Sequence, residues 1–286
     1  MVTPIRVLHP EKTLLIIVGV GGTGGYVLQQ VARLLYALKE QGQKIPSVLL
    51  VDGDVVEQKN LLRQYFLPQD LGKKKAEVLA QRYALAYGID IVAYPEYLDE
   101  QRTITDLIAS VHTPERPYGR VEPITPVIVG CVDNAPTRKL LHEQVHALRD
   151  GVYIDSGNGG VTIPDDPEHI SRYQLAKIKA TGWDGQVVVG VRRNGQDVMP
   201  FPGEVFPSLL EADEGETLPS EQHCGEVVVS QPQRLMTNLM AATSVLMVLH
   251  TLLADGTLLH HRTFFDAHKG FVRSETAIDH VLEVSI

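Results

Sequence analysis

The chain has 286 residues, of which 44% are hydrophobic and 21% are charged, and its formal net charge is −9. This is the composition of an ordinary globular protein, and it excludes a largely disordered chain. The negative charge also leaves no overall basic surface, so general binding to nucleic acid is not expected.

The first 160 residues alternate between short apolar runs and amphipathic helical patterns. Strands are predicted at residues 14–18, 48–51, 89–94, 126–131 and 152–155, and helices at residues 26–41, 74–86 and 137–148. Such alternation predicts parallel strands joined by right-handed helical crossovers. The expected fold class is therefore α/β, with a doubly wound, mostly parallel, Rossmann-like sheet.

After the fifth strand the chain is rich in glycine, proline and other turn residues. A hairpin is predicted for residues 187–199, around an Asn-Gly turn. A long helix is expected at residues 233–254. Two short strands, at residues 263–266 and 270–273, are expected to close the sheet with an antiparallel edge.

Residues 235–254 carry no charge, and this run is long enough to be considered as a membrane span. Polar side chains are scattered through it, so we expect a core helix and no membrane insertion. The N-terminus shows no apolar signal segment. The two cysteines, Cys131 and Cys224, form no disulfide framework and no paired-cysteine zinc site. The expected location is the cytoplasm, and no structural zinc is expected.

A glycine-rich turn, GVGGTG at residues 19–24, follows the first predicted strand and opens the first predicted helix. Glycines at such a turn let the backbone approach a phosphate and leave the N-terminus of the helix free to bind an anion. Asp52 ends the second strand, where a dinucleotide-binding protein places an acid on the ribose. The motif predicts a nucleotide site without identifying the nucleotide.

Charge is distributed unevenly along the chain. Residues 59–82 hold six basic residues against two acidic ones, a local charge of +4. A triphosphate attacked by an anionic nucleophile needs such positive charge, so ATP is favoured over NAD, and an NAD-dependent oxidoreductase is the less favoured alternative. Residues 204–226 hold seven acidic residues and no lysine or arginine. We expect them to form a solvated, mobile loop that borders the approach of a basic-faced partner.

Five motifs occur in one order: GVGGTG (19–24), DGDVV (52–56), NLLRQ (60–64), LGKKKAE (71–77) and CVDNAPTR (131–138). Together they resemble the E1-like superfamily of ThiF, MoeB and HesA proteins, which activate ubiquitin-like and sulfur-carrier proteins. The chain length and the missing zinc cysteines make the chain most similar to the ThiF-related proteins of plasmid-borne PRTRC cassettes. Residues 160–230 match the superfamily poorly.

The resemblance implies a role for each matching residue. Asp52 would bind the ribose of ATP, and Asp133 would position Mg²⁺ beside the α-phosphate. Asn60, Arg63 and Lys75 would contact the phosphates, and Arg63, Lys75 and Asp133 would act in catalysis. The implied nucleotide-binding set is Gly19, Gly21, Gly22, Gly24, Asp52, Asp54, Asn60, Arg63, Gln64, Lys75, Asp133 and Asn134.

The implied reaction is attack by the C-terminal carboxylate of a small ubiquitin-like or sulfur-carrier protein on the α-phosphate of ATP. Its products are an acyl adenylate and pyrophosphate. The resemblance also implies a homodimer. Residues 1–160 would then form a nucleotide-binding half, and residues 161–286 a partner-facing part of the same E1-like domain. The alternative is a non-catalytic module that binds ATP and docks a partner.

Two further features carry chemistry. Cys224 lies where similar proteins place a cysteine that accepts the acyl group, and both a catalytic and a structural role are open for it. Cys131, at a strand end, is expected to belong to the core. Residues 142–146, HEQVH, form a literal HExxH metal-binding sequence. Because the helix has the apolar pattern of an ordinary crossover, we expect two solvated histidines there rather than a metalloprotease site.

Overall fold

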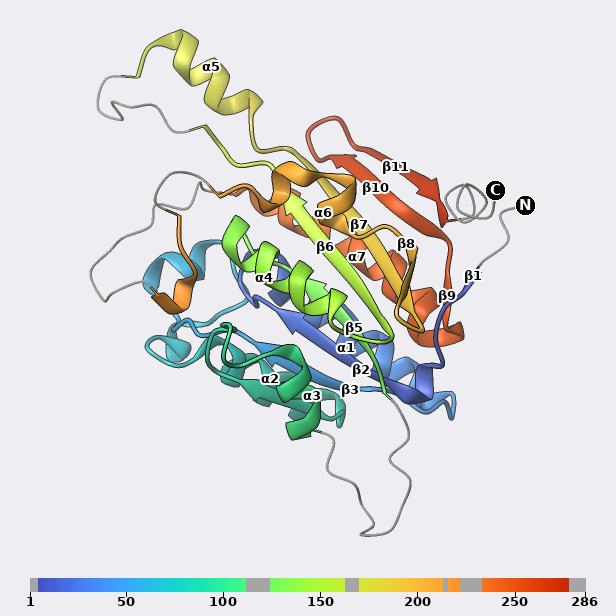
Figure 1. Ribbon diagram of the computed structural model, residues 1–286. Helices are drawn as coiled ribbons and strands as arrows, with labels where there is room; N and C mark the ends of the chain where they lie inside the picture. The colour runs from blue at the N-terminus through green and yellow to red at the C-terminus, as the bar shows by residue number, and fades with distance from the viewer. Residues whose placement is uncertain (1–4, 112–123, 163–169, 213–215, 222–232, 278–286) are drawn as a thin grey trace, which may run out of the picture.

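The computed structural model describes residues 5–111, 124–162, 170–212, 216–221 and 233–277. Within these ranges nine strands form one sheet (Figure 1), in the order β11-β10-β7-β6-β5-β2-β3-β4, with β8 paired to β7. The strands are β2 (Thr13–Val18), β3 (Ser47–Val51), β4 (Ile91–Tyr94), β5 (Thr125–Gly130), β6 (Gly151–Asn158), β7 (Asp184–Arg193), β8 (Gln196–Met199), β10 (His260–Asp266) and β11 (Phe271–Thr276). Two short strands, β1 (Ile5–Arg6) and β9 (Thr257–Leu258), pair separately.

The five strands β4-β3-β2-β5-β6 are parallel, whereas β7, β10 and β11 extend the sheet in antiparallel pairs. This confirms the predicted doubly wound α/β sheet with an antiparallel C-terminal edge. The chain leaves β2 toward β3 on one side and later returns to β5 on the other. The carboxyl ends of β2 and β5 therefore flank the point where the strand order reverses, which is where open α/β sheets bind ligands.

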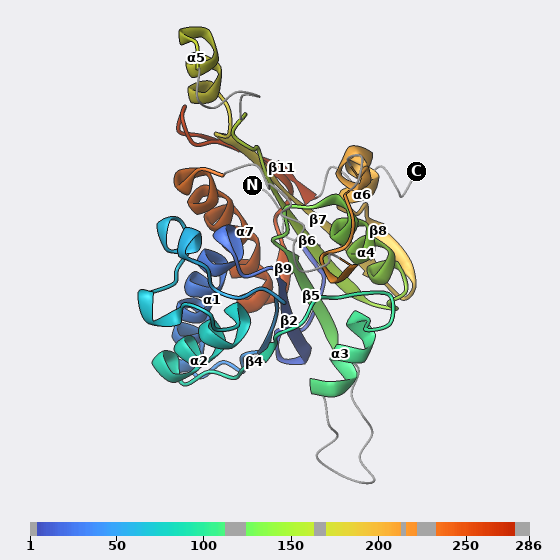
Figure 2. The same ribbon diagram turned by 90° about the vertical axis from the view of Figure 1, so that its left-hand side faces the viewer.

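Helices cover both faces of the sheet (Figure 2). One face carries α1 (Gly22–Glu40), α2 (Lys75–Tyr87) and α7 (Leu235–Asp255), and the other carries α3 (Ile104–Val111), α4 (Ala135–His146) and α6 (Pro202–Val205). The helix α5 (Arg172–Ala180) projects away from the sheet and buries none of its residues. Short 3₁₀ turns are η1 (Pro10–Lys12), η2 (Gln58–Leu62), η3 (Pro68–Asp70), η4 (Pro207–Leu210) and η5 (Pro219–Glu221).

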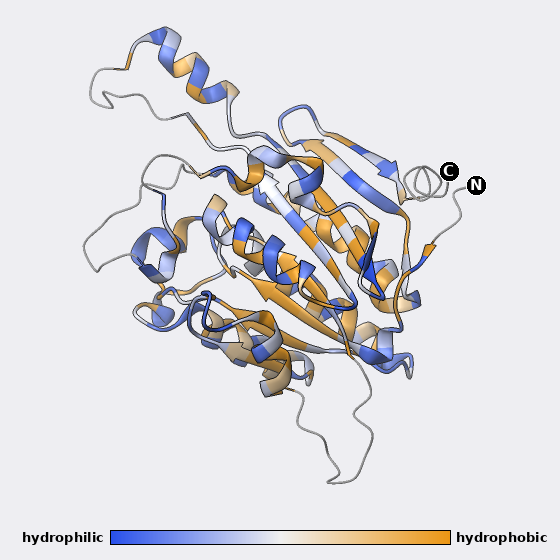
Figure 3. Ribbon diagram, in the orientation of Figure 1, coloured by the Kyte–Doolittle hydropathy of each residue, from blue (hydrophilic) through white to orange (hydrophobic). Residues whose placement is uncertain are grey.

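The strands β2, β3 and β5 are hydrophobic along most of their length (Figure 3), because helices cover the sheet on both sides. All six residues of β2 are buried. One cluster of buried apolar side chains lies between the sheet and α1, α2 and α7, and a second lies between the sheet and α3 and α4. These two layers hold the carboxyl ends of the parallel strands in place.

Among the helices of the described ranges, α7 is the one long and apolar enough to cross a membrane. Half of its most apolar window, 50%, is buried by the protein itself. Its Ala241, Val245 and Leu249 are completely buried on the side of the sheet that also carries α1. This packing is that of the core helix predicted from the sequence.

The acidic segment at residues 204–226 differs in part from its prediction. Its described part includes η4 and η5, and two of its acids contact α4. The Glu204 carboxylate lies 3.3 Å from the imidazole of His146, and the Glu216 carboxylate accepts a hydrogen bond of 3.2 Å from the backbone N–H of Ala135. These two acids therefore have partners on α4, which the sequence does not predict, although Glu204, like Glu211 and Glu221, is exposed as expected. Residues 213–215 and 222–226 of the segment lie outside the described residues.

Candidate functional site

The glycine turn after β2 joins the ends of three parallel strands. The Gly19 N–H donates to the Val51 carbonyl at the end of β3, and the Cys131 N–H donates to the Val18 carbonyl, at 2.9 and 2.8 Å. Gly19 has a φ of +82°, and a Cβ there would lie 2.7 Å from the Cys131 carbonyl oxygen. A Cβ on Gly24 would lie 1.9 Å from the Gly19 carbonyl oxygen. Both positions therefore require glycine.

The N-terminus of α1 is open to an anion. Gly21 is the N-cap residue and offers no side chain to the first N–H groups of the helix. These groups carry the positive end of the helix dipole, so the backbone of Gly21, Gly22 and Gly24 forms a site suited to phosphate. Gln64 lies beside it, because its Nε2 is 3.4 Å from where a Cβ of Gly21 would be. The Oε1 of Gln64 is buried and has no hydrogen-bond partner within the described part of the chain.

A cluster of three polar side chains adjoins the first turn of α1; Thr23 and Asn238 are buried, and Asn158 is half-buried. The Nδ2 of Asn158, at the end of β6, donates to Thr23 Oγ1 at 2.9 Å and to Asn238 Oδ1 at 3.0 Å. The Nδ2 of Asn238 would touch a Cβ at Gly22, at 2.4 Å. Among the residues that the structure describes, neither this Nδ2 nor the buried Oδ1 of Asn158 has a hydrogen-bond partner. Buried groups of this kind need partners, so the cluster is equipped to bind a polar ligand or water.

No motif in the sequence assigns this cluster to the site. Asn238 was visible only as one of several polar residues in an apolar helix, and Asn158 follows the last residue predicted to be in β6. Thr23 stood inside the glycine motif without a role. No local pattern shows that these three residues, 135 and 80 positions apart along the chain, meet at the first turn of α1.

Asp52 lies at the carboxyl end of β3, and the residue is only 8% exposed. Its two oxygens accept hydrogen bonds from the backbone N–H groups of Val20, at 2.7 Å, and Asp54, at 2.9 Å. Burial raises the pKa of Asp52, and the nearby charge of Lys75 opposes this shift. The carboxylate is thereby fixed directly beside the glycine turn, and each oxygen has lone pairs left for a ligand hydroxyl.

Lys75 begins α2 and is almost completely buried. Its Nζ donates to Asp54 Oδ2 at 2.7 Å, and the Tyr97 hydroxyl donates to Asp54 Oδ1. Burial opposes ionisation of Asp54, but the charge of Lys75 and its hydrogen bond outweigh this effect, so the pKa of Asp54 is lowered. Asp54 and Lys75 are therefore brought together as a pair next to Asp52.

The depressed pKa of Asp54 predicts a specific dependence of stability on pH. A carboxyl whose pKa falls on folding stabilises the native state above its unfolded pKa of about 3.9, and this contribution is lost as the pH falls through the folded pKa. We expect Asp54→Asn to be less stable than the wild type at pH 6, and the difference to disappear toward pH 3. Urea midpoints measured from pH 3 to 6 test this, and a difference that grows on acidification would contradict it.

Three of the six basic side chains at residues 59–82 form ion pairs with nearby acidic side chains. Lys59 contacts Glu57 at 2.7 Å, Lys75 contacts Asp54, and Arg82 contacts Asp70 at 2.5 Å. Lys74 donates to the Gly53 carbonyl. The half-buried Arg63 has no ion-pair partner among the residues that the structure describes. Its guanidinium, on the residue before Gln64, is therefore a cation that this stretch leaves without an acidic partner in the described ranges.

Two asparagines of the expected nucleotide-binding set act as caps. Asn60 is buried, and its Oδ1 accepts the Glu57 N–H at 2.8 Å in the capping box of η2. The Oδ1 of Asn134 accepts the Thr137 N–H at 2.9 Å and so caps α4. In this structure both side chains fix the loops that carry other site residues.

Asp133 lies between β5 and α4 at the carboxyl edge of the sheet. Its side chain is exposed and forms no ion pair within the described ranges. The loop is held from below by Arg138, whose Nη2 donates to the Val132 carbonyl at 2.7 Å. Asp133 is therefore a free carboxylate on a fixed loop, next to the glycine turn that Cys131 supports.

A buried ion pair lies beneath this loop and was not predicted. Arg138 Nε is 3.3 Å from Asp155 Oδ2, and their side chains are 13% and 1% exposed. The hydroxyl of Tyr153 donates to the same carboxylate oxygen at 3.0 Å. The other oxygen, Asp155 Oδ1, has no hydrogen-bond partner among the described residues. The CVDNAPTR motif contains Arg138, but the sequence does not show that its charge is matched by the last part of β6.

Of the two cysteines, the structure describes only Cys131. Cys131 is half-buried, and burial raises the pKa of its thiol, so that the thiol stays protonated, as expected for a core residue. Cys224 lies outside the described residues.

Comparison with known proteins agrees with this architecture. The profile of the ThiF family matches residues 10–279. The chain belongs to the ThiF family. This places the glycine turn, Asp52, Arg63, Lys75 and Asp133 within the matched region.

Solved structures show the same fold. The chain is similar to PaaA, with 17% identity and a TM-score of 0.53 over 93% of this chain and 64% of PaaA. It is also similar to MccB of E. coli in complex with AMPCPP and MccA, with 15% identity and a TM-score of 0.53 over 93% of this chain and 64% of MccB. The chain thus spans 64% of the length of these solved chains. Comparison with curated proteins finds no match.

Proposed function

We propose that the chain binds ATP at the glycine turn and transfers the adenylyl group to the C-terminal carboxylate of a small protein or peptide. One observation carries this proposal. In a chain of the ThiF family, the N-terminus of α1, which has no side-chain cap, lies between the buried carboxylate of Asp52 and the side-chain amide of Gln64. The Oε1 of this amide has no hydrogen-bond partner among the described residues. Free N–H groups suit phosphate, and a fixed carboxylate suits the hydroxyls of a ribose.

Each group would serve one part of ATP. Asp52 would accept hydrogen bonds from the ribose, and the backbone of the glycine turn would donate to the phosphates. The Arg63 guanidinium would bind phosphate oxygens in the bidentate geometry that arginine favours. Lys75 would add positive charge from inside the fold, where Asp54 fixes its amine.

Asp133 is the residue that would hold Mg²⁺, because its exposed carboxylate is an oxygen ligand at the carboxyl edge of the sheet. When bound there, Mg²⁺ would neutralise charge on the phosphates. The partner's carboxylate would attack the α-phosphorus, the bond to the bridging oxygen of pyrophosphate would break, and pyrophosphate would leave. Arg63 would stabilise the charge that develops on this leaving group.

The proposed partner is a small ubiquitin-like or sulfur-carrier protein in the cytoplasm. MccB, which shares the fold, was solved with AMPCPP and MccA bound together. We infer that residues 161–286 face the partner in this chain, and that residues 1–160 supply the nucleotide site. A PRTRC cassette as the source of the partner, a homodimer and acyl transfer to Cys224 belong to the same proposal.

ATP–pyrophosphate exchange tests the activity, with small proteins that co-purify with the chain as candidate substrates. We expect exchange that depends on both the partner and Mg²⁺. Tight ATP binding without exchange with any recovered partner would favour the alternative, a non-catalytic docking module. Enhanced NADH fluorescence without stabilisation by ATP would instead favour the dehydrogenase alternative.

Removal of the Arg63 guanidinium is expected to weaken ATP binding without destabilising the fold. Arg63→Ala removes one charge-assisted contact of about 1.5–3 kcal/mol, so the Kd for ATP should rise roughly 10- to 100-fold with little change in Tm. The matched control is Lys59→Ala on the same segment, because Lys59 is exposed and pairs with Glu57. Isothermal titration with ATP measures both variants, and equal losses would show that only general charge matters.

A further inference from the structure

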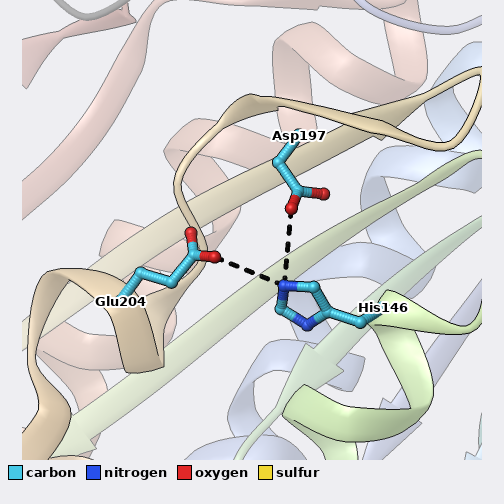
Figure 4. Close-up of side chains that lie close together, drawn as sticks. All are labelled: His146, Asp197 and Glu204. Atoms are coloured by element: carbon cyan, nitrogen blue, oxygen red, sulfur yellow. Dashed lines mark hydrogen bonds and ion pairs between the residues drawn. The ribbon is translucent and has the colours of Figure 1, made fainter.

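The C-terminal part of α4 carries the HExxH sequence, and its surroundings differ from those expected. The histidines are not both solvated: His142 Nδ1 is buried, and no residue that the structure describes forms a hydrogen bond with it. His146 projects toward two carboxylates from other elements, Asp197 on β8 and Glu204 on α6 (Figure 4). Within the described residues the group of possible metal ligands contains His146 but not His142, so the metalloprotease pairing of two imidazoles is not formed.

The distances in this cluster are compatible with a shared metal ion. The three ligand atoms lie within 4.8 Å of one another. His146 Nε2 lies 3.3 Å from Glu204 Oε1, which is within hydrogen-bond distance, and 3.5 Å from Asp197 Oδ2. Both distances are longer than the length of about 2.7–2.9 Å that is usual for a charge-assisted hydrogen bond, and two ligands of a tetrahedral zinc ion, each bound at about 2.05 Å, lie about 3.3 Å apart.

Each of the three side chains is also held in place through its other polar atom. His146 Nδ1 forms a hydrogen bond of 2.8 Å with the His142 carbonyl oxygen, which orients the ring so that Nε2 faces the two carboxylates. Glu204 Oε2 accepts the Phe201 N–H at 2.8 Å, and Asp197 Oδ1 pairs with Arg192. Such outer partners, which fix the tautomer and the orientation of each ligand, are typical of protein metal sites.

We propose that His146, Asp197 and Glu204 bind one divalent transition-metal ion, of which Zn²⁺ is the best match, with water completing the coordination. Two carboxylates converge on one ring nitrogen of His146, and Arg192 pairs with only one of them, so a divalent cation held by the three ligand atoms would balance the remaining negative charge. The imidazole ligand favours zinc over Mg²⁺ and Ca²⁺, which prefer oxygen ligands alone.

The ion would link three elements that are far apart in the sequence. It would join the end of α4 to β8 and to α6. At its other end, α4 begins directly after the loop that carries Asp133. Its role is therefore structural support of this helix, and the inference does not depend on ATP chemistry. The absence of paired cysteines excludes only zinc sites that are made of cysteine.

Titration of tag-free, metal-stripped protein with ZnCl₂ tests the proposal. We expect one Zn²⁺ per chain by calorimetry and a rise in Tm of several degrees with zinc. The near-isosteric variants Asp197→Asn and Glu204→Gln, and His146→Ala, should each weaken zinc binding about a hundred-fold or more. Glu143→Gln, on an exposed residue of the same helix, is the matched control and should bind zinc like the wild type.

Two results would overturn the proposal. One is a wild-type protein that binds no zinc, in which case His146 serves as a cation between the two acids. The other is zinc binding that survives in both Asp197→Asn and Glu204→Gln, which would place the ion elsewhere on the chain. Because these two variants change only one atom each, circular dichroism can confirm that they fold, and the test does not depend on His146→Ala alone.

Discussion

Asp133→Asn is expected to lower ATP–pyrophosphate exchange at least about a hundred-fold while ATP still binds. Asp133 is exposed and forms no ion pair within the described ranges, so its replacement leaves the fold and the glycine turn intact. The amide keeps the shape of the side chain but loses the negative charge that would hold Mg²⁺ beside the α-phosphate. The defect should therefore appear in the transfer step and in its dependence on Mg²⁺.

Two measurements separate this expectation from a general loss of function. The Kd for ATP without Mg²⁺ should change less than about threefold, because the ribose and phosphate contacts at Asp52 and the glycine turn are untouched. Exchange should need higher Mg²⁺ concentrations or fail altogether. Glu40→Gln, an exposed residue at the distant end of α1, is the control for the loss of one negative charge. Undiminished exchange in Asp133→Asn would remove this carboxylate from the mechanism.

The parts of the site that the sequence predicts are those set by local chain geometry. A buried strand followed by GVGGTG specifies the turn, because a Cβ on Gly19 or Gly24 would collide with backbone. Asp52 follows β3 directly, so its place at the carboxyl edge is determined once the strand is known. The parallel pairing of the strands and the α/β fold class could likewise be predicted from the alternation of strands and helices.

The remaining features depend on contacts that no local pattern encodes. The sequence contains six basic residues at positions 59–82, but only the fold shows that three of them form ion pairs, with Glu57, Asp54 and Asp70. The meeting of Thr23, Asn158 and Asn238 likewise depends on the packing of α7 beside α1. The sequence predicts that the acids of residues 204–226 face solvent. It cannot show that, on α4, the backbone N–H of Ala135 contacts Glu216 and the imidazole of His146 contacts Glu204.

The buried pair of Arg138 and Asp155 is expected to give the largest effect on stability. Arg138→Met leaves the Asp155 carboxylate almost completely buried without its cation, and the loss of one partner of such a pair costs about 3–5 kcal/mol. Tyr153 supplies one hydrogen bond to Asp155, which does not replace a full charge. Urea unfolding followed by circular dichroism measures the loss, and a change below about 1 kcal/mol would show that water or a rotated side chain solvates the carboxylate.

The double variant Arg138→Met/Asp155→Leu separates stability from positioning. Because well-packed apolar side chains can replace a buried ion pair at little cost, this variant should recover most of the lost stability. It should still be defective in exchange, since the hydrogen bond from Arg138 to the Val132 carbonyl, which fixes the loop of Asp133, is gone. Recovery of both properties would mean that the pair serves the fold alone, whereas recovery of stability without exchange identifies Arg138 as the residue that positions Asp133.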